Sequence, residues 1–250
     1  MLIDRHVLKR TFPLSGGPGW PCPSCGEGTL KPVEESFKHE DRNASDPEWD
    51  FWSADFVYAC LLRCNNDRCC ETVSSAGVGG LERKVDQFED EPPVFEYVEY
   101  FVPRFFEPPL RIIKIPESCP ETVSEPLEES FRLLFASPRA AVNSIRIAME
   151  KLLTALKVKR FSISKNKRKP ITLHNRIDLM PKKYSDLKKY VLASKWLGNA
   201  GSHGRENVTL DDVLDAYEMT EHVLQKIYAP KQKKVTAIAK KINKKKGPTR

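Results

Sequence analysis

Two cysteine-rich segments constrain the fold of this chain more than any other feature. The first, WPCPSCGEG, holds Cys22 and Cys25 in a C-x2-C spacing and continues with Gly26. Two thiolates at this spacing can turn toward one metal ion while backbone amides of the tight turn point at their sulfurs. Glycine supplies the positive φ that such a turn needs. We therefore expect the first segment to form one half of a metal site.

The second segment, YACLLRCNNDRCCETV, holds four cysteines, so several ligand pairs fit it. We favour Cys64 and Cys69, because the Asn and Asp residues at 65–67 lie between them and suit a chain reversal. Cys70 then follows Cys69 as a glycine follows the second cysteine of the first segment, and Cys60 falls on a strand. Either Cys60 or Cys70 remains an alternative ligand.

The favoured ligands Cys22, Cys25, Cys64 and Cys69 would satisfy tetrahedral zinc and leave no position for a catalytic water, so the predicted zinc is structural. Zinc binding contributes on the order of 10–16 kcal/mol to folding, which a segment with a small core needs. Seven cysteines in a chain without a secretory signal favour metal binding over disulfides, because a reducing compartment keeps thiols free. The alternative is a set of unrelated free or buried thiols.

Strand-forming residues accompany the cysteine segments. Residues 51–63 (FWSADFVYACLLR) are rich in aromatic and branched side chains and predict a strand that leads into the second segment. Residues 94–116 are similarly rich but contain four prolines, so short edge strands or extended segments fit best. The aromatic FVPRFF stretch within them suits either a protein core or the stacking of nucleic-acid bases.

The second half of the chain predicts helices. Ser137 and Pro138 suit the N-cap and first turn of a long amphipathic helix. Thr209 and Asp212 suit a capping box at the start of the last helix of the bundle. Further helices are predicted over residues 127–135, 173–180 and 185–197.

Together these patterns predict an α+β protein. We expect a four-cysteine zinc ribbon with short strands over residues 1–116, an all-α bundle over residues 117–230, and a disordered basic tail over residues 231–250. The chain has no apolar run of about eighteen residues and no signal peptide. Both features favour a cytoplasmic protein without membrane contact.

Positive charge is concentrated in two segments. Residues 231–250 carry nine positive charges and no acid, so the net charge of +7 leaves −2 for the rest of the chain. Residues 157–170 carry seven positive charges and no acid. Such segments bind polyanions, although a tail that only improves solubility explains the first of them equally well. The candidate nucleic-acid contacts are Lys157, Lys159, Arg160, Lys167, Arg168, Lys169, Lys244, Lys245 and Lys246.

Residues 195–210 (KWLGNAGSHGRENVTL) form a glycine-interrupted stretch with one histidine between two helical segments. Gly198 sits where a left-handed C-cap would end the preceding helix, so we expect a loop at the end of the bundle. In a structural interpretation Gly198 caps the helix, Asn199 bonds the turn and His203 satisfies buried carbonyls. A functional interpretation depends on a resemblance of this stretch to a known family.

Several motifs resemble a known family. They are the two cysteine segments, AAVNSIRIAMEKLL with Arg146 and Glu150 one helical turn apart, KWLGNAGSH, and AYEMTEHVLQKIY. Over roughly residues 22–228 they resemble the bacterial family of domains of unknown function numbered forty-one forty-five. The most specific part is the G-N-x-x-x-H element at residues 198–203.

The resemblance implies a fold and an activity. That family is grouped with the HEPN superfamily, helical bundles that often dimerise and in many members are metal-independent ribonucleases of defence and toxin systems. Their motif places an arginine and a polar residue several positions before a histidine. Asn199 and His203 resemble the last two, whereas Gly198 stands where the arginine is expected, and Lys195 or Arg205 would have to supply the charge.

RNA cleavage needs a base that works near neutral pH and a cation or donor that stabilises the charge on the phosphate. His203 suits the base, and Lys195, Arg205 or the backbone amides around Gly198 suit the phosphate. We therefore expect an RNA-directed protein of a bacterial defence or stress system, whose activity as a ribonuclease is left open. The expected partners are RNA or another nucleic acid, a second copy of the chain, and a defence enzyme. The alternative is a non-catalytic dimerisation or adaptor protein that docks a partner enzyme.

Overall fold

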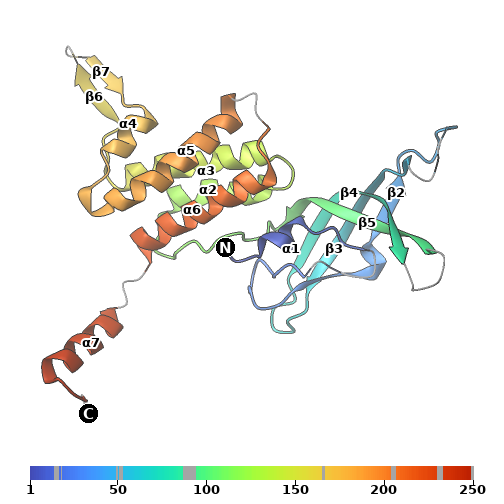
Figure 1. Cartoon of the computed structure of the whole chain (residues 1–250), viewed down its shortest axis with the longest axis horizontal. Helices are drawn as coiled ribbons and strands as arrows, with labels where there is room; N and C mark the ends of the chain where they lie inside the picture. Colours follow the sequence, from blue (N-terminus) through green and yellow to red (C-terminus); the bar gives the residue numbers. More distant parts are fainter. Residues whose placement is uncertain are drawn as a thin grey trace.

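The computed structural model of the chain describes residues 1–13, 17, 19–48, 50, 53–86, 94–164, 167–203, 207–229 and 233–248. Figure 1 shows two lobes, one built from strands that precede Glu107 and one built mainly from the helices that follow. An α+β protein is thus confirmed at the level of an amino-terminal sheet and a carboxy-terminal helical region.

The amino-terminal lobe is an antiparallel sheet. Its elements are α1 Arg5–Lys9, β1 Leu30–Pro32, η1 Glu34–Ser36, β2 Lys38–Asp41, β3 Phe56–Cys64, β4 Thr72–Asp86 and β5 Val94–Glu107. The strand order is β1-β3-β4-β5, with β2 also paired to β3. Side chains of β3 alternate between buried and exposed, as expected for a sheet with one face on a core. The strand predicted over residues 51–63 is confirmed from Phe56 onward; residues 51 and 52 lie outside the described residues.

The expectation of short edge strands or extended segments from residue 94 onward is wrong, because this region forms the long strand β5. It runs unbroken for 14 residues, and Pro103 lies within it. Proline is tolerated there because β5 ends the strand order and the pairing with β4 shifts register between Ala76 and Gly77. A Cβ on Gly77 would lie 2.9 Å from the Cα of Pro103, so glycine is required opposite the proline.

An aromatic core fills the buried side of the sheet. Phe12 contacts Trp20 and Tyr58 edge-on, both at 5.5 Å between ring centroids, and Phe37 stacks on Tyr58 at 5.4 Å. Phe101, from the FVPRFF stretch, is fully buried among these rings. The FVPRFF stretch was expected either to form protein core or to stack nucleic-acid bases, and Phe101 belongs to the core.

The carboxy-terminal lobe is helical with one added hairpin. Its elements are α2 Glu121–Leu133, α3 Pro138–Ala155, β6 Phe161–Ser164, β7 Lys167–Pro170, α4 Leu173–Asp178, η3 Lys182–Leu187, α5 Lys188–His203, α6 Leu210–Tyr228 and α7 Lys233–Lys245. Helix α3 packs against α2, α5 and α6, and its buried face is apolar. The hairpin β6–β7 departs from the all-α expectation for this region.

Both predicted helix caps are confirmed. The Ser137 side chain accepts a hydrogen bond from the Ala140 backbone N–H at the start of α3. Thr209 and Asp212 form a reciprocal capping box at the start of α6, which satisfies two backbone donors that the helix leaves unpaired. These ends are specified locally, because cap and partner lie within one turn of each other.

The helix end expected at Leu197 is wrong, because residues 198–203 are helical and not a loop. Helix α5 continues through Gly198 to His203. The glycines serve packing: a Cβ on Gly198 would lie 2.5 Å from the Arg146 Cβ, and one on Gly201 would lie 2.7 Å from the Arg139 carbonyl oxygen. Glycine therefore lets α5 approach α3 closely, rather than ending the helix as a left-handed cap.

The tail also differs from its expected disorder, since Lys233–Lys245 form α7. Lysine and alanine favour helix, and Ile238 and Ile242 fall one turn apart on it. Both isoleucines are exposed, and Figure 1 shows α7 standing apart from the other helices.

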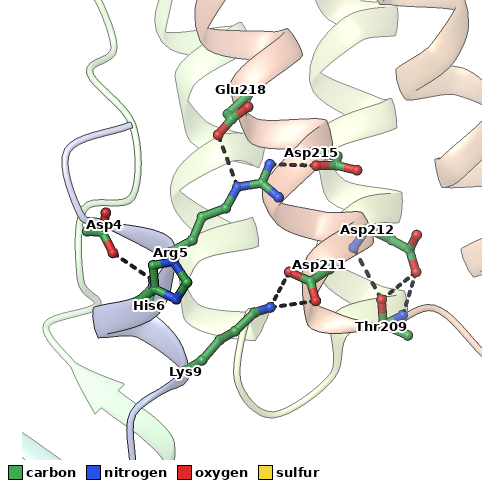
Figure 2. A network of polar contacts seen from close by, with 9 residues as sticks. All are labelled: Asp4, Arg5, His6, Lys9, Thr209, Asp211, Asp212, Asp215 and Glu218. Carbon is green, nitrogen blue, oxygen red and sulfur yellow. Dashed lines mark hydrogen bonds and ion pairs between the residues drawn. The ribbon is translucent and has the colours of Figure 1, made fainter.

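Ion pairs join the two lobes through α1 and α6 (Figure 2). Arg5 lies 2.5 Å from Asp215 and 3.0 Å from Glu218, and Lys9 pairs with Asp211. The carboxylates are more than half exposed, so each pair contributes only about 0.2–1 kcal/mol. These ion pairs therefore orient α1 against α6 more than they stabilise the fold.

Candidate metal centre and nucleic-acid interface

Four cysteines from two turns converge at one end of the sheet. Cys22 and Cys25 precede β1, Cys64 ends β3, and Cys69 lies in the turn before β4. Their sulfur atoms all lie within 4.8 Å of one another. Cys22 Sγ is 3.8 Å from Cys69 Sγ, and Cys25 Sγ is 3.7 Å from Cys64 Sγ. The cluster can hold a metal ion.

The two turns have the same construction. Gly26, after Cys25, has φ +68°, and Cys70, after Cys69, has φ +51°. The expected equivalence of Cys70 and Gly26 is therefore present in the backbone. The backbone N–H of Gly28 points at Cys25 Sγ at 3.4 Å. Such amides stabilise thiolates.

Hydrogen bonding and burial act on these thiols in opposite directions. The backbone N–H groups of Gly28 and Glu27 lower the pKa of Cys25 to about 6. Burial raises the pKa of Cys64 to about 12. Four thiolates at this separation repel one another, so a bound cation is needed for all of them to be ionised together.

The remaining cysteines lie outside this cluster. Cys60 is buried on β3, and burial raises its pKa to about 11. The exposed Cys70 directs its thiol toward the Asn66 and Asp67 carbonyl oxygens. The geometry thus favours Cys69 over either alternative as the fourth member.

The residues proposed for RNA cleavage fall on α5 or beyond it. Lys195 is 8% exposed, and its Nζ lies 3.3 Å from the centroid of the Trp196 ring. Asn199 is half-buried one turn later, and His203 is the last residue of the helix. The His203 side chain and Arg205 lie outside the described residues. Helical spacing therefore puts Lys195, Asn199 and His203 along one face.

Helix α3 packs an arginine against Gly198 of α5. The aliphatic part of Arg146 lies against Gly198, its guanidinium pairs with Glu150, and its Nε donates to Asn143 Oδ1 at 3.2 Å. The expectation that Arg146 and Glu150 face each other is confirmed. Sequence spacing alone could not reveal the contact with Gly198, because it depends on how two helices pack.

The basic segment at 157–170 forms an exposed hairpin. Lys157, Lys159 and Arg160 precede β6, and Lys167, Arg168 and Lys169 lie on β7; all six are exposed. The pairing of Ile163 with Arg168 and of Phe161 with Pro170 places Phe161, Ile163 and Arg168 on one face. Arg168 covers the Phe161 ring at 3.8 Å, and these side chains border a hollow of about 690 Å3.

The other face of the hairpin carries polar and basic residues. Ser162 pairs with Lys169 and Ser164 with Lys167. Ile163 is 82% exposed, which is unusual for a large apolar side chain in a short hairpin. On α7, Lys244 and Lys245 are exposed, as is Lys246 beyond its end.

The fold and the cysteine cluster define a two-lobed α+β protein with a candidate metal centre in the sheet lobe. Residues 128–245 match the family described as "Domain of unknown function (DUF4145)", which confirms the resemblance for the helical lobe. Residues 10–106 match a different family, "Domain of unknown function (DUF8608)", so the resemblance does not extend back to Cys22 as expected. No curated protein matches the chain, and no solved structure does. In the described part of the chain, every helix is too short or too polar to span a bilayer.

Proposed function

We propose that the protein binds nucleic acid, with RNA as its ligand, through the hairpin β6–β7. The observation that carries this proposal is the hairpin face of Phe161, Ile163 and Arg168, with the exposed lysines of β7 on the opposite face. Lysine and arginine neutralise phosphates, while an aromatic ring such as that of half-buried Phe161 offers a surface on which an unpaired base can stack. The hairpin combines both in one projecting element (Figure 1).

The lysines of α7 supply a second, less specific contribution. Exposed Lys244, Lys245 and Lys246 lie at the carboxy-terminal end of a helix without acidic residues. Such a helix raises affinity for any polyanion and makes binding depend on salt. It adds affinity, whereas the hairpin adds the preference for unpaired bases.

Binding of a fluorescent single-stranded RNA, measured by anisotropy at several salt concentrations, tests the proposal. Replacing Lys167, Arg168 and Lys169 by alanine should remove up to three phosphate contacts and reduce the log–log salt slope by about 2, given about 0.7 per phosphate. The matched control replaces Lys182, Lys183 and Lys189, which are exposed on η3 and α5, and should leave the slope nearly unchanged. Equal losses in both triple variants would show that only net charge matters.

The metal of the four-cysteine cluster is zinc in this proposal. A Zn–S distance of about 2.3 Å in a tetrahedron separates sulfur atoms by about 3.8 Å, close to the 3.7 and 3.8 Å of the two sulfur pairs in the structure. Four cysteine ligands leave no open position, so the zinc would hold the two turns together and take no part in chemistry. The sheet lobe would thus be a zinc ribbon.

Metal analysis of purified protein tests the zinc assignment. We expect one zinc per chain, lost in Cys69→Ser and retained in the matched variants Cys60→Ser and Cys70→Ser. Protein that carries no zinc, or Cys69→Ser protein that retains it, would contradict the assignment.

A second candidate function is metal-independent RNA cleavage at the α3–α5 face, in a HEPN-like bundle. The contact of Arg146 with Gly198 favours it, because it brings an arginine from α3 to the position where the motif lacks one. His203 would act as base, Asn199 would hold the phosphate, and the charge would come from Arg146 in addition to Lys195 or Arg205. RNA cleavage that is lost in both His203→Ala and Arg146→Gln would support this function. Cleavage that persists in His203→Ala would exclude this function, and cleavage that persists in Arg146→Gln would exclude the role of Arg146 in it.

The proposed setting is a bacterial defence or stress system, in the cytoplasm, with the helical lobe as a homodimer and a defence enzyme as a further partner. The rival function is a non-catalytic adaptor that docks that enzyme. Sedimentation with and without RNA separates the two. The adaptor predicts a stable dimer that binds no RNA, whereas the main proposal predicts RNA binding.

A further inference from the structure

A cavity of about 280 Å3 lies beneath the base of the hairpin, between α2, α3 and α4. Its polar lining comes from Thr122, Glu150, Lys151, Thr154, Arg160 and Arg176. Among the described residues, its lining includes none from α5. Arg160 also borders the hairpin hollow, so the two spaces are neighbours.

Arg176 is the unusual member of this lining. It is 5% exposed, so its guanidinium is removed from water. Nη1 donates to the Glu150 backbone oxygen at 3.3 Å and Nη2 donates to Thr154 Oγ1 at 2.9 Å. The buried Nε has no partner. Among the described residues, no carboxylate lies within 4.0 Å of this guanidinium.

A buried cation bound only by neutral groups is costly unless an anion joins it. Glu150, the acidic member of the described lining, is already paired with Arg146. Lys151 and Arg160 add positive charge at the rim. Burial lowers the pKa of Arg176, the charge of Glu150 raises it, and Arg160 lowers it. With one carboxylate against Lys151, Arg160 and Arg176, the charged residues of the lining carry a net positive charge.

The size of the cavity limits what can bind there. Pockets for drug-sized ligands occupy about 300–1,000 Å3, so this cavity lies below the lower end of that range and suits a small group. A phosphate monoester fits both requirements, because it is compact, carries close to two negative charges at neutral pH and offers three acceptor oxygens. Guanidinium groups bind phosphate through paired N–H donors.

We propose that this cavity binds one phosphate group, with Arg176 Nε as the inner donor and Lys151 and Arg160 closing the rim. The source of that phosphate is the end of an RNA strand held by the hairpin, an assignment that rests on the proposed function. Affinity of the cavity for phosphate itself does not rest on it.

Titration with inorganic phosphate in a phosphate-free buffer tests the site directly. Phosphate should raise the melting temperature of the full chain progressively with the logarithm of its concentration, beyond the effect of chloride at equal ionic strength. Arg176→Gln should weaken binding by about tenfold or more. Lys151→Ala, at an exposed position, should weaken binding as well, whereas the control Lys182→Ala should not. A phosphate effect no larger than that of chloride, or equal effects in Lys151→Ala and Lys182→Ala, would overturn the proposal.

Single-stranded RNAs of one sequence with phosphate or hydroxyl ends identify the source. We expect the parent to prefer one phosphorylated end by about tenfold, and Lys151→Ala to lose that preference. Phosphate binding without preference for any RNA end would assign the cavity to free phosphate and overturn the RNA assignment. If RNA binds but neither free phosphate nor a phosphorylated RNA end has any effect, the proposed phosphate site in the cavity is wrong. The proposed RNA binding by the hairpin would be unaffected by that result.

Discussion

Gly198 provides a quantitative test of how α5 packs against α3. In an exposed helix Gly→Ala stabilises by about 0.8–1 kcal/mol, because glycine loses more backbone freedom on folding. Here the added Cβ would lie 2.5 Å from the Arg146 Cβ and 2.9 Å from its Cδ. Ordinary carbon contacts are about 3.5–4.0 Å, so α5 and α3 would have to separate by about 1 Å.

Separation of two packed helices costs about 1–3 kcal/mol, as in other overpacked cores. This cost exceeds the propensity gain, so Gly198→Ala should lower the free energy of unfolding by about 1 kcal/mol. Replacing Arg146 by glycine removes the clashing carbon. In that background Gly198→Ala should become stabilising, which gives a coupling energy of about 1–3 kcal/mol between the two positions.

Urea unfolding followed by the helical circular dichroism signal measures all four members of this cycle. If Gly198→Ala stabilises the parent by the full propensity gain, Gly198 is not required by packing and the reasoning is refuted. A coupling energy near zero would refute it equally.

Three further outcomes are expected. Removal of residues 231–250 should reduce the salt slope of RNA binding by about 0.7 for each phosphate that the tail neutralises; the melting temperature should stay almost unchanged, because α7 stands apart from the other helices (Figure 1). Arg5→Ala with Lys9→Ala should lower the unfolding free energy by about 0.5–2 kcal/mol at low salt and by much less at about 1 M salt, measured by chemical denaturation. Thr209→Ala removes one side of the capping box and should cost about 1 kcal/mol, visible as an earlier melting transition.

Features that depend on neighbouring residues could be predicted from the sequence. Ser137 and Thr209 mark helix starts because a cap and its partner lie within one turn. The four-cysteine cluster could be predicted because both turns repeat one local pattern, including a positive φ after Cys25 and after Cys69.

Features that depend on contacts between distant residues could not be predicted from the sequence. Gly198 resembles a helix end until Arg146 is known to lie against it. Strand β4 contains three glycines, which weaken a strand pattern, yet Gly77 is required where Pro103 of the next strand approaches. Arg176 looks like any surface arginine in the sequence, and only packing shows that it is buried without an anion.

Photo-crosslinking of single-stranded RNA to the full chain tests the central claim most directly. Peptides identified by mass spectrometry should carry crosslinks at Phe161 and along β6–β7, with weaker labelling of α7. Replacing Lys167, Arg168 and Lys169 by alanine should remove the hairpin crosslinks and leave those of α7. Crosslinks confined to the sheet lobe, or a hairpin that is never labelled, would contradict the assignment of the RNA-binding surface.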